Sequence, residues 1–125
     1  MNAVVLVDTS SWIHLLRPGG DANVRSRVEQ LLADGEACWC PVVRLELWNG
    51  AGGERDRKVL REFEAALTEL PIGADVWTAS FDLARRARAR GITAPATDLL
   101  IAACARVHDA GIEAADAEFA AIERV

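Results

Sequence analysis

The sequence has few cysteines and no long apolar run. Three cysteines among 125 residues are too few and too unevenly spaced for a disulfide framework. The first apolar run, from Val4 to Val7, stops at Asp8 without the basic leader of a signal peptide, and no run approaches the roughly 20 residues needed to cross a bilayer. We therefore expect a cytoplasmic protein with reduced thiols and no membrane partner.

The cysteines raise one alternative, a zinc site. Cys38 and Cys40 lie two apart in an apolar stretch, and Cys104 and His108 lie four apart on a predicted helix. Cys-x-Cys is not the usual zinc spacing, whereas buried thiols are ordinary core groups. We predict buried thiols and keep zinc as the alternative.

The sequence also lacks anything that resembles a linker. Its four prolines are scattered, and it contains no internal repeat or low-complexity tract. With 125 residues, of which 51% are apolar, the chain has the size and composition to bury one core. We predict a single domain over residues 1–125.

Excess positive charge is missing as well. The formal net charge is −5, whereas domains that bind nucleic acid by bulk attraction are usually basic. The objection weakens if carboxylates gather at one metal site, because two divalent cations among four carboxylates would bring the charge to about −1. The arginine-rich segments 55–61 and 85–90 are predicted to be solvated helix faces, with phosphate contacts as the alternative.

Apolar periodicity predicts alternating strands and helices. Residues 4–7 form a run typical of a strand buried on both faces, and Thr9 or Ser10 can cap the helix that follows. A helix after Pro41 is predicted to bury a face containing Leu45. Further helices are predicted over 21–33, 54–68, 74–90, 97–107 and 116–122, and short strands over 37–40, 70–72 and 112–115. This alternation indicates an α/β fold with a parallel sheet.

Acidic residues follow the predicted strands. Ligands of open parallel sheets bind beyond the carboxyl ends of the strands. Asp8 ends the first strand, Asp98 opens a helix after an extended segment, and Asp116 follows the last strand. Glu46, inside an apolar helix, can join them as a partly buried acid that needs a partner. We expect these carboxylates to converge, although an acid at the position of Asp98 or Asp116, taken alone, is more often a cap or a solvated side chain.

Such convergence requires a compensating charge. Two carboxylates about 4 Å apart repel by roughly 4 kcal/mol at an effective dielectric constant near 20. Mg²⁺ and Mn²⁺ prefer carboxylate oxygens and water, and they stabilise the oxygens of an in-line displacement at phosphorus. A site made only of carboxylates therefore indicates phosphoryl transfer.

Three segments resemble the motifs of VapC-type PIN-domain toxins. Residues 5–13 read VLVDTSSWI, which is similar to the opening motif of that family, and residues 97–103 read TDLLIAA, which is similar to its later signature. Residues 43–47, VRLEL, fit the intervening segment that supplies a glutamate. The order and spacing of the segments match, so the resemblance covers essentially the whole chain.

The resemblance implies a fold, a reaction and partners. The fold would be a PIN-like three-layer sandwich, with a central, mostly parallel sheet of four or five short strands flanked by helices. The activity would be that of a ribonuclease toxin of a VapBC toxin–antitoxin system, an endoribonuclease in which metal-activated water attacks the RNA phosphate. The partners would be RNA, a cognate VapB-type antitoxin and a second copy in a homodimer, with a heterotetramer or larger assembly when antitoxin is bound.

The same resemblance implies the site residues. Mg²⁺, or Mn²⁺ in its place, would be held by Asp8, Glu46, Asp98 and Asp116, with Ser10 as an accessory hydroxyl. The family often has a polar residue shortly before the fourth acid and then Asp-x-Asp-Phe, whereas residues 114–119 read AADAEF. Asp116 fits the first acid of that motif and Glu118 fits the second less well, so the choice of the fourth ligand between them stays open.

Three other functions remain to be weighed. A phosphatase of the haloacid dehalogenase type also places an Asp after the first strand, but it has a second acid where this chain has Ser10. A phosphate-accepting receiver domain needs paired early acids and a late lysine, and Lys58 is the single lysine. A catalytically inactive PIN domain that serves as a scaffold or antitoxin-binding module would be expected to have lost some of the four acids, which are all present.

Overall fold

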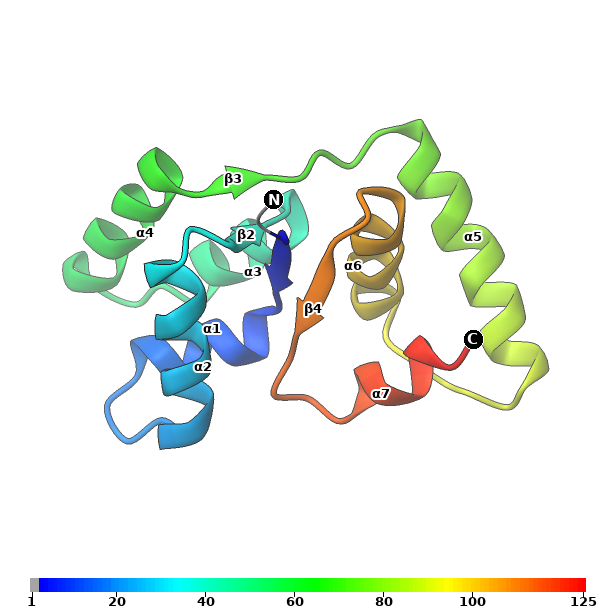
Figure 1. Cartoon of the computed structure of the whole chain (residues 1–125), viewed down its shortest axis with the longest axis horizontal. Helices are drawn as coiled ribbons and strands as arrows, with labels where there is room; N and C mark the ends of the chain where they lie inside the picture. The colour runs from blue at the N-terminus through cyan, green and yellow to red at the C-terminus, as the bar shows by residue number, and fades with distance from the viewer. Residues whose placement is uncertain (1–2) are drawn as a thin grey trace.

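The computed structural model describes residues 3–125, which form a parallel sheet flanked by helices (Figure 1). The four strands in this range are β1 (Val5–Val7), β2 (Ala37–Trp39), β3 (Thr68–Glu69) and β4 (Gly111–Glu113). The seven helices in this range are α1 (Thr9–Leu16), α2 (Ala22–Ala33), α3 (Pro41–Asn49), α4 (Glu54–Ala66), α5 (Ala74–Ala89), α6 (Ala96–Val107) and α7 (Glu118–Glu123). The predicted α/β fold class is confirmed.

The sheet brings the ends of β1 and β4 together. Its strand order is β3-β2-β1-β4, and all neighbouring pairs are parallel. Val7 is in register with Glu113, and the Asp8 amide donates to the Glu113 carbonyl at 2.8 Å. The chain segments that leave β1 and β4 therefore start side by side at the carboxyl edge of the sheet, where ligands of such sheets bind.

Helices cover both sides of the sheet and give three layers. In Figure 1, α5 and α6 lie on one side of β4, and α1, α2 and α4 lie on the other side of the sheet. The core includes the strand residues Leu6 and Trp39 and a continuous buried stretch of α6 from Leu100 to Ala105. Since α6 packs between the sheet and α5, the Asp98 turn at its start is held in a fixed place.

Two expectations for α1 and α3 are wrong. The residue that caps α1 is Asp8, whose carboxylate accepts the Ser10 N–H, and Thr9 already lies inside the helix. Aspartate caps helices as well as serine does, and here it directly follows the strand. In α3 the buried residues are Val43 and Leu47, whereas Leu45 is 68% exposed. The residues four apart, Val43 and Leu47, share the face that packs on the core.

The strand predicted at 70–72 is also displaced, since β3 ends at Glu69. Pro71 has no N–H to continue the ladder, and the last bond on this side is from the Leu70 N–H to the Trp39 carbonyl, at 2.8 Å. The last helix starts two residues later than predicted, at Glu118. The Asp116 side chain accepts the Glu118 N–H at 3.0 Å, and such a local bond holds the chain in a bend before the helix.

The thiols are buried and free, as predicted. Cys38, Cys40 and Cys104 are all buried and unpaired by disulfides. Across residues 3–125, the single group of three acidic, histidine or cysteine side chains with the spacing of metal ligands contains no cysteine. The His108 Nε2 atom instead lies 2.8 Å from the Pro71 carbonyl oxygen, so the zinc alternative is unsupported. None of the helices in this range has both the length and the apolarity to cross a membrane.

Candidate metal centre

Asp8 is fixed by the helix it caps. It directly follows the buried strand β1, and the residue is only 4% exposed. Its Oδ2 atom accepts hydrogen bonds from the Ser10 amide at 3.1 Å and from the Ser10 hydroxyl at 2.6 Å. A helix N-terminus favours a negative charge. One oxygen of Asp8 is therefore occupied by the protein, and the carboxylate cannot turn freely.

Asp98 is the least satisfied acid of the site. It lies in the first turn of α6, and its Oδ2 atom is buried without a hydrogen-bond partner among residues 3–125. Burial, the adjoining Glu118 side chain and the charges of Asp8, Glu118 and Asp116 together raise the pKa of Asp98 to about 7. A buried carboxylate oxygen without a partner is costly, and a cation would remove that cost.

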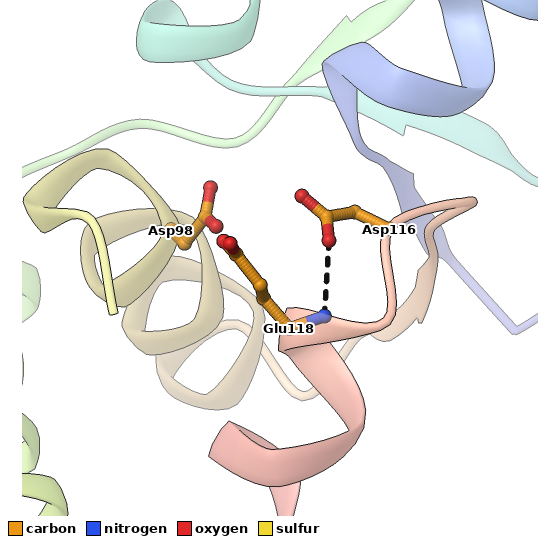
Figure 2. A group of neighbouring side chains, drawn as sticks. All are labelled: Asp98, Asp116 and Glu118. Atoms are coloured by element: carbon orange, nitrogen blue, oxygen red, sulfur yellow. Dashed lines mark hydrogen bonds between the residues drawn. The ribbon is translucent and has the colours of Figure 1, made fainter. Parts of the chain in front are cut away.

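Asp116 and Glu118 approach Asp98 from the segment that joins β4 to α7. One carboxylate oxygen of each of the three residues lies within 4.8 Å of the other two. Figure 2 shows Asp98 and Glu118 pointing toward one another, with Asp116 facing them from the preceding loop. The structure thus brings both Asp116 and Glu118 next to Asp98.

Ser10 connects Asp8 to this cluster. Its hydroxyl donates to Asp8 and accepts the Ala115 N–H at 3.1 Å, and Ala115 immediately precedes Asp116. Asp8 is outside the group of three, yet its charge contributes to the raised pKa of Asp98. The structure thus gathers the acids after β1, after β4 and at the start of α6 at one edge of the sheet, as predicted from their positions in the chain.

Glu46 lies outside the group of three and is held by Thr9, the residue that follows Asp8. Its Oε1 atom accepts a hydrogen bond from the Thr9 hydroxyl at 2.8 Å, and it lines a pocket between α1, α3 and α4 together with Ile13 and Leu47. Glu46 therefore has the partner that a partly buried acid needs. Thr9 was not recognised from the sequence as the residue that orients it.

Glu113 was also missed as a functional candidate. It lies at the end of β4, and its side chain accepts hydrogen bonds from Ser11 and Arg27. An acid within an otherwise apolar strand needs a partner, and this requirement was the available signal.

The chemistry of the cluster suits a hard divalent cation. Its ligand atoms are all carboxylate oxygens, the donors that Mg²⁺, Mn²⁺ and Ca²⁺ prefer. The unpaired Oδ2 atom of Asp98 and the mutual repulsion of the acids are features that such an ion would stabilise. The acidic cluster can therefore hold a divalent metal.

Comparison with known proteins identifies the family. The family model for the PIN domain matches residues 5–125. This chain belongs to the PIN domain family. A relative from Mycobacterium tuberculosis, ribonuclease VapC11, is 30% identical over 126 residues, which cover 98% of this chain and 93% of the relative.

Solved PIN-domain structures share the fold. The VapBC2 structure from Rickettsia felis, bound to a DNA fragment from its promoter, superposes with a TM-score of 0.76 at 16% identity and covers 98% of this chain and 92% of the other. VapC20 from Mycobacterium tuberculosis, described as a toxin that cleaves the sarcin-ricin loop, gives a TM-score of 0.72 at 22% identity, with 94% and 93% covered. These likenesses confirm the three-layer PIN-like architecture.

Proposed function

We propose that this PIN-domain protein is a Mg²⁺-dependent endoribonuclease and the toxin of a type II toxin–antitoxin pair. The observation that carries the proposal is the carboxylate cluster around Asp98, whose buried Oδ2 atom has no hydrogen-bond partner among residues 3–125. Relatives at 30% identity bear the name ribonuclease. Membership of the PIN family also favours this activity over a phosphatase of the haloacid dehalogenase type or a receiver domain.

The proposed site residues differ in how they would act on the cation. Asp98, Asp116 and Glu118 would hold the cation directly, and Asp8 would complete the site from the end of β1. Glu46, whose carboxylate is held by the Thr9 hydroxyl, would act on the bound RNA at the same edge of the sheet. A bound Mg²⁺ or Mn²⁺ would supply activation of water and charge stabilisation at the RNA phosphate. Ser10 would hold the Asp8 carboxylate in position during the reaction through its two hydrogen bonds.

Because the protein has a net negative charge, RNA would have to be held by individual cationic side chains rather than by the overall charge of the protein. On α4, Arg57 and Arg61 pair with Glu54, which agrees with a solvated helix face. Arg55 and Lys58 make no ion pair within residues 3–125 and are exposed, so they are the α4 cations best placed to contact phosphate.

We further propose the assembly that the resemblance implies. A single PIN domain would pair with a second copy, and a VapB-type antitoxin would bind to give a heterotetramer or a larger complex. Structures of this fold include VapBC complexes, some of them bound to DNA. Size-exclusion chromatography with light scattering, with and without the product of an adjacent small gene, tests this assembly.

The nuclease proposal is tested by cleavage of RNA with purified protein. We expect cleavage in Mg²⁺ or Mn²⁺, no cleavage in chelator, and loss of cleavage in Asp98→Asn with the fold retained. Asp34→Asn is the matched control, because Asp34 is an exposed acid at the end of α2 and outside the cluster. Cleavage by Asp98→Asn in chelator would refute the proposal, and inactivity of the wild-type protein with either metal would favour an inactive scaffold.

A further inference from the structure

The carboxylate of Glu113 joins three elements beside the acidic cluster. Its Oε2 atom accepts the Ser11 hydroxyl at 2.8 Å, and its Oε1 atom accepts the Arg27 Nε at 2.6 Å. Ser11 lies in α1, Arg27 in α2 and Glu113 at the end of β4. The Glu113 side chain is 11% exposed, and Ser11 is fully buried. Burial opposes ionisation of Glu113, but the bonds from Arg27 and Ser11 outweigh it and lower its pKa.

These bonds hold the start of the segment that carries Asp116 and Glu118. Two consecutive serines of α1 form hydrogen bonds with the residues that precede those acids. Ser11 donates to the Glu113 side chain, and the Ser10 hydroxyl accepts the Ala115 amide. Beyond these bonds, the hydrogen bonds of this segment are local: the Glu118 amide donates to the Asp116 side chain, and the Ala117 carbonyl accepts the Ala120 amide at the start of α7. The segment is otherwise a bend on the surface, as Figure 2 shows, so its course depends on where it is anchored.

We propose that Arg27, Glu113 and Ser11 form a positioning network that sets the place of Asp116 and Glu118 relative to Asp8 and Asp98. The effect of this network on metal binding rests on the proposed nuclease function. Its effect on the order of residues 114–118 does not, because the anchoring bonds are present in the protein alone. None of the three residues needs to touch the cation or RNA.

A purely structural role makes a different prediction. The Arg27 side chain is 51% exposed, and a single exposed ion pair contributes little to stability. If Arg27 served only stability, its removal would change the melting temperature slightly and would leave the cluster unaltered. If it positions the segment, its removal should loosen residues 114–118 while the rest of the protein stays folded.

The test compares Arg27→Met with Arg25→Met. Arg25 lies on the same helix and also reaches α1, but it donates to the carbonyls of His14 and Arg17, away from Glu113. In metal-free protein, hydrogen exchange of the Ala115 and Glu118 amides should become about tenfold faster in Arg27→Met and stay unchanged in Arg25→Met. Equal protection of both amides in wild type and Arg27→Met would overturn the proposal.

Calorimetric titration with Mn²⁺ supplies the second readout. Loss of an outer partner typically weakens metal affinity by about tenfold or more, so Arg27→Met and Ser11→Ala should bind Mn²⁺ about tenfold more weakly than wild type. Arg27→Lys should recover part of the affinity, since it keeps the charge. Unchanged affinity in Arg27→Met would count against the network. Absence of Mn²⁺ binding in wild type would instead overturn the proposed function, and the exchange experiment would still decide the network.

Discussion

Asp8 lies beside the acidic cluster and Asp98 belongs to it, and the surroundings of the two carboxylates differ. Asp8 follows a buried strand, caps α1 and accepts two hydrogen bonds from Ser10. The buried Oδ2 atom of Asp98 has no hydrogen-bond partner in the described part of the chain, and the pKa of Asp98 is raised to about 7. Asp8 thus has a structural role as the cap of α1, whereas the carboxylate of Asp98 is held where a proton or a cation would stabilise it.

The largest expected effect is on the rate of RNA cleavage, where substitution of Asp8 and substitution of Asp98 should have similar effects. Asp8→Asn and Asp98→Asn should each reduce the rate of RNA cleavage by about a thousandfold, since each removes a charge next to the proposed cation. Single-turnover cleavage of a labelled RNA in Mg²⁺ measures both. Activity within a factor of ten of wild type for either variant would remove that residue from the centre.

Stability should separate the two residues. Asp8→Ala removes a helix cap and should lower the free energy of unfolding by about 1 kcal/mol. Asp98→Ala removes a carboxylate that is repelled by its neighbours, so the free energy of unfolding of the metal-free protein should rise at neutral pH. Urea denaturation in chelator at pH 7.5 compares them. Equal destabilisation by both substitutions would contradict the contrast.

The pH dependence of the metal-free protein sharpens the contrast further. The pKa of Asp98 is raised from its ordinary value of 3.8 to about 7, so the folded state binds a proton that the unfolded state releases between these values. This contribution to stability is present below pH 3.8 and is lost as the pH rises toward 7. Thermal unfolding of wild type and Asp98→Asn between pH 4 and 8 should differ in slope by this contribution, whereas identical slopes would show that Asp98 titrates normally.

Metal binding should show the opposite pH trend. The cation requires the ionised form of Asp98, so Mn²⁺ affinity should rise as the pH increases through about 7. Titration calorimetry at pH 6 and pH 8 measures the change. An affinity independent of pH in this range would mean that Asp98 is already ionised or is not a ligand.

The smallest expected effect concerns Glu46. Thr9→Val removes the hydroxyl that donates to Glu46 and keeps the shape of the side chain, so the lost hydrogen bond, worth about 1 kcal/mol, should lower the rate of cleavage by about fivefold. Thr68→Val, on the short strand β3, is a control outside the site. A rate equal to wild type for Thr9→Val would show that the orientation of Glu46 does not matter for the reaction.

The parts of the site that follow from chain direction were predictable. A buried strand that stops at Asp8 and an acid in the first turn of a helix place both residues at the carboxyl edge of a parallel sheet, whichever side chains surround them. Asp116 followed from the same rule. Glu46 was a candidate as a partly buried acid of an apolar helix, and the resemblance to VapC-type toxins added the expectation that it is a metal ligand and that the activity is that of a nuclease.

The remaining details depend on contacts between distant segments. Glu118 joins Asp98 because the local bond from its amide to Asp116 bends the chain before α7, and no spacing rule predicts that bend. The exposure of Leu45 depends on which face of α3 meets the core, and the early end of β3 depends on Pro71. The role of Glu113 is set by partners 86 and 102 residues away in the chain.

The most direct test of the account is the position of a bound metal. Crystals grown or soaked with Mn²⁺ should show an anomalous difference peak among Asp98, Asp116 and Glu118, with metal–oxygen distances of about 2.1 Å and with Asp8 facing the ion. A peak elsewhere in the molecule with Asp98 unligated, or no peak at a Mn²⁺ concentration that supports cleavage, would contradict the claim that these distant acids converge to hold a catalytic cation.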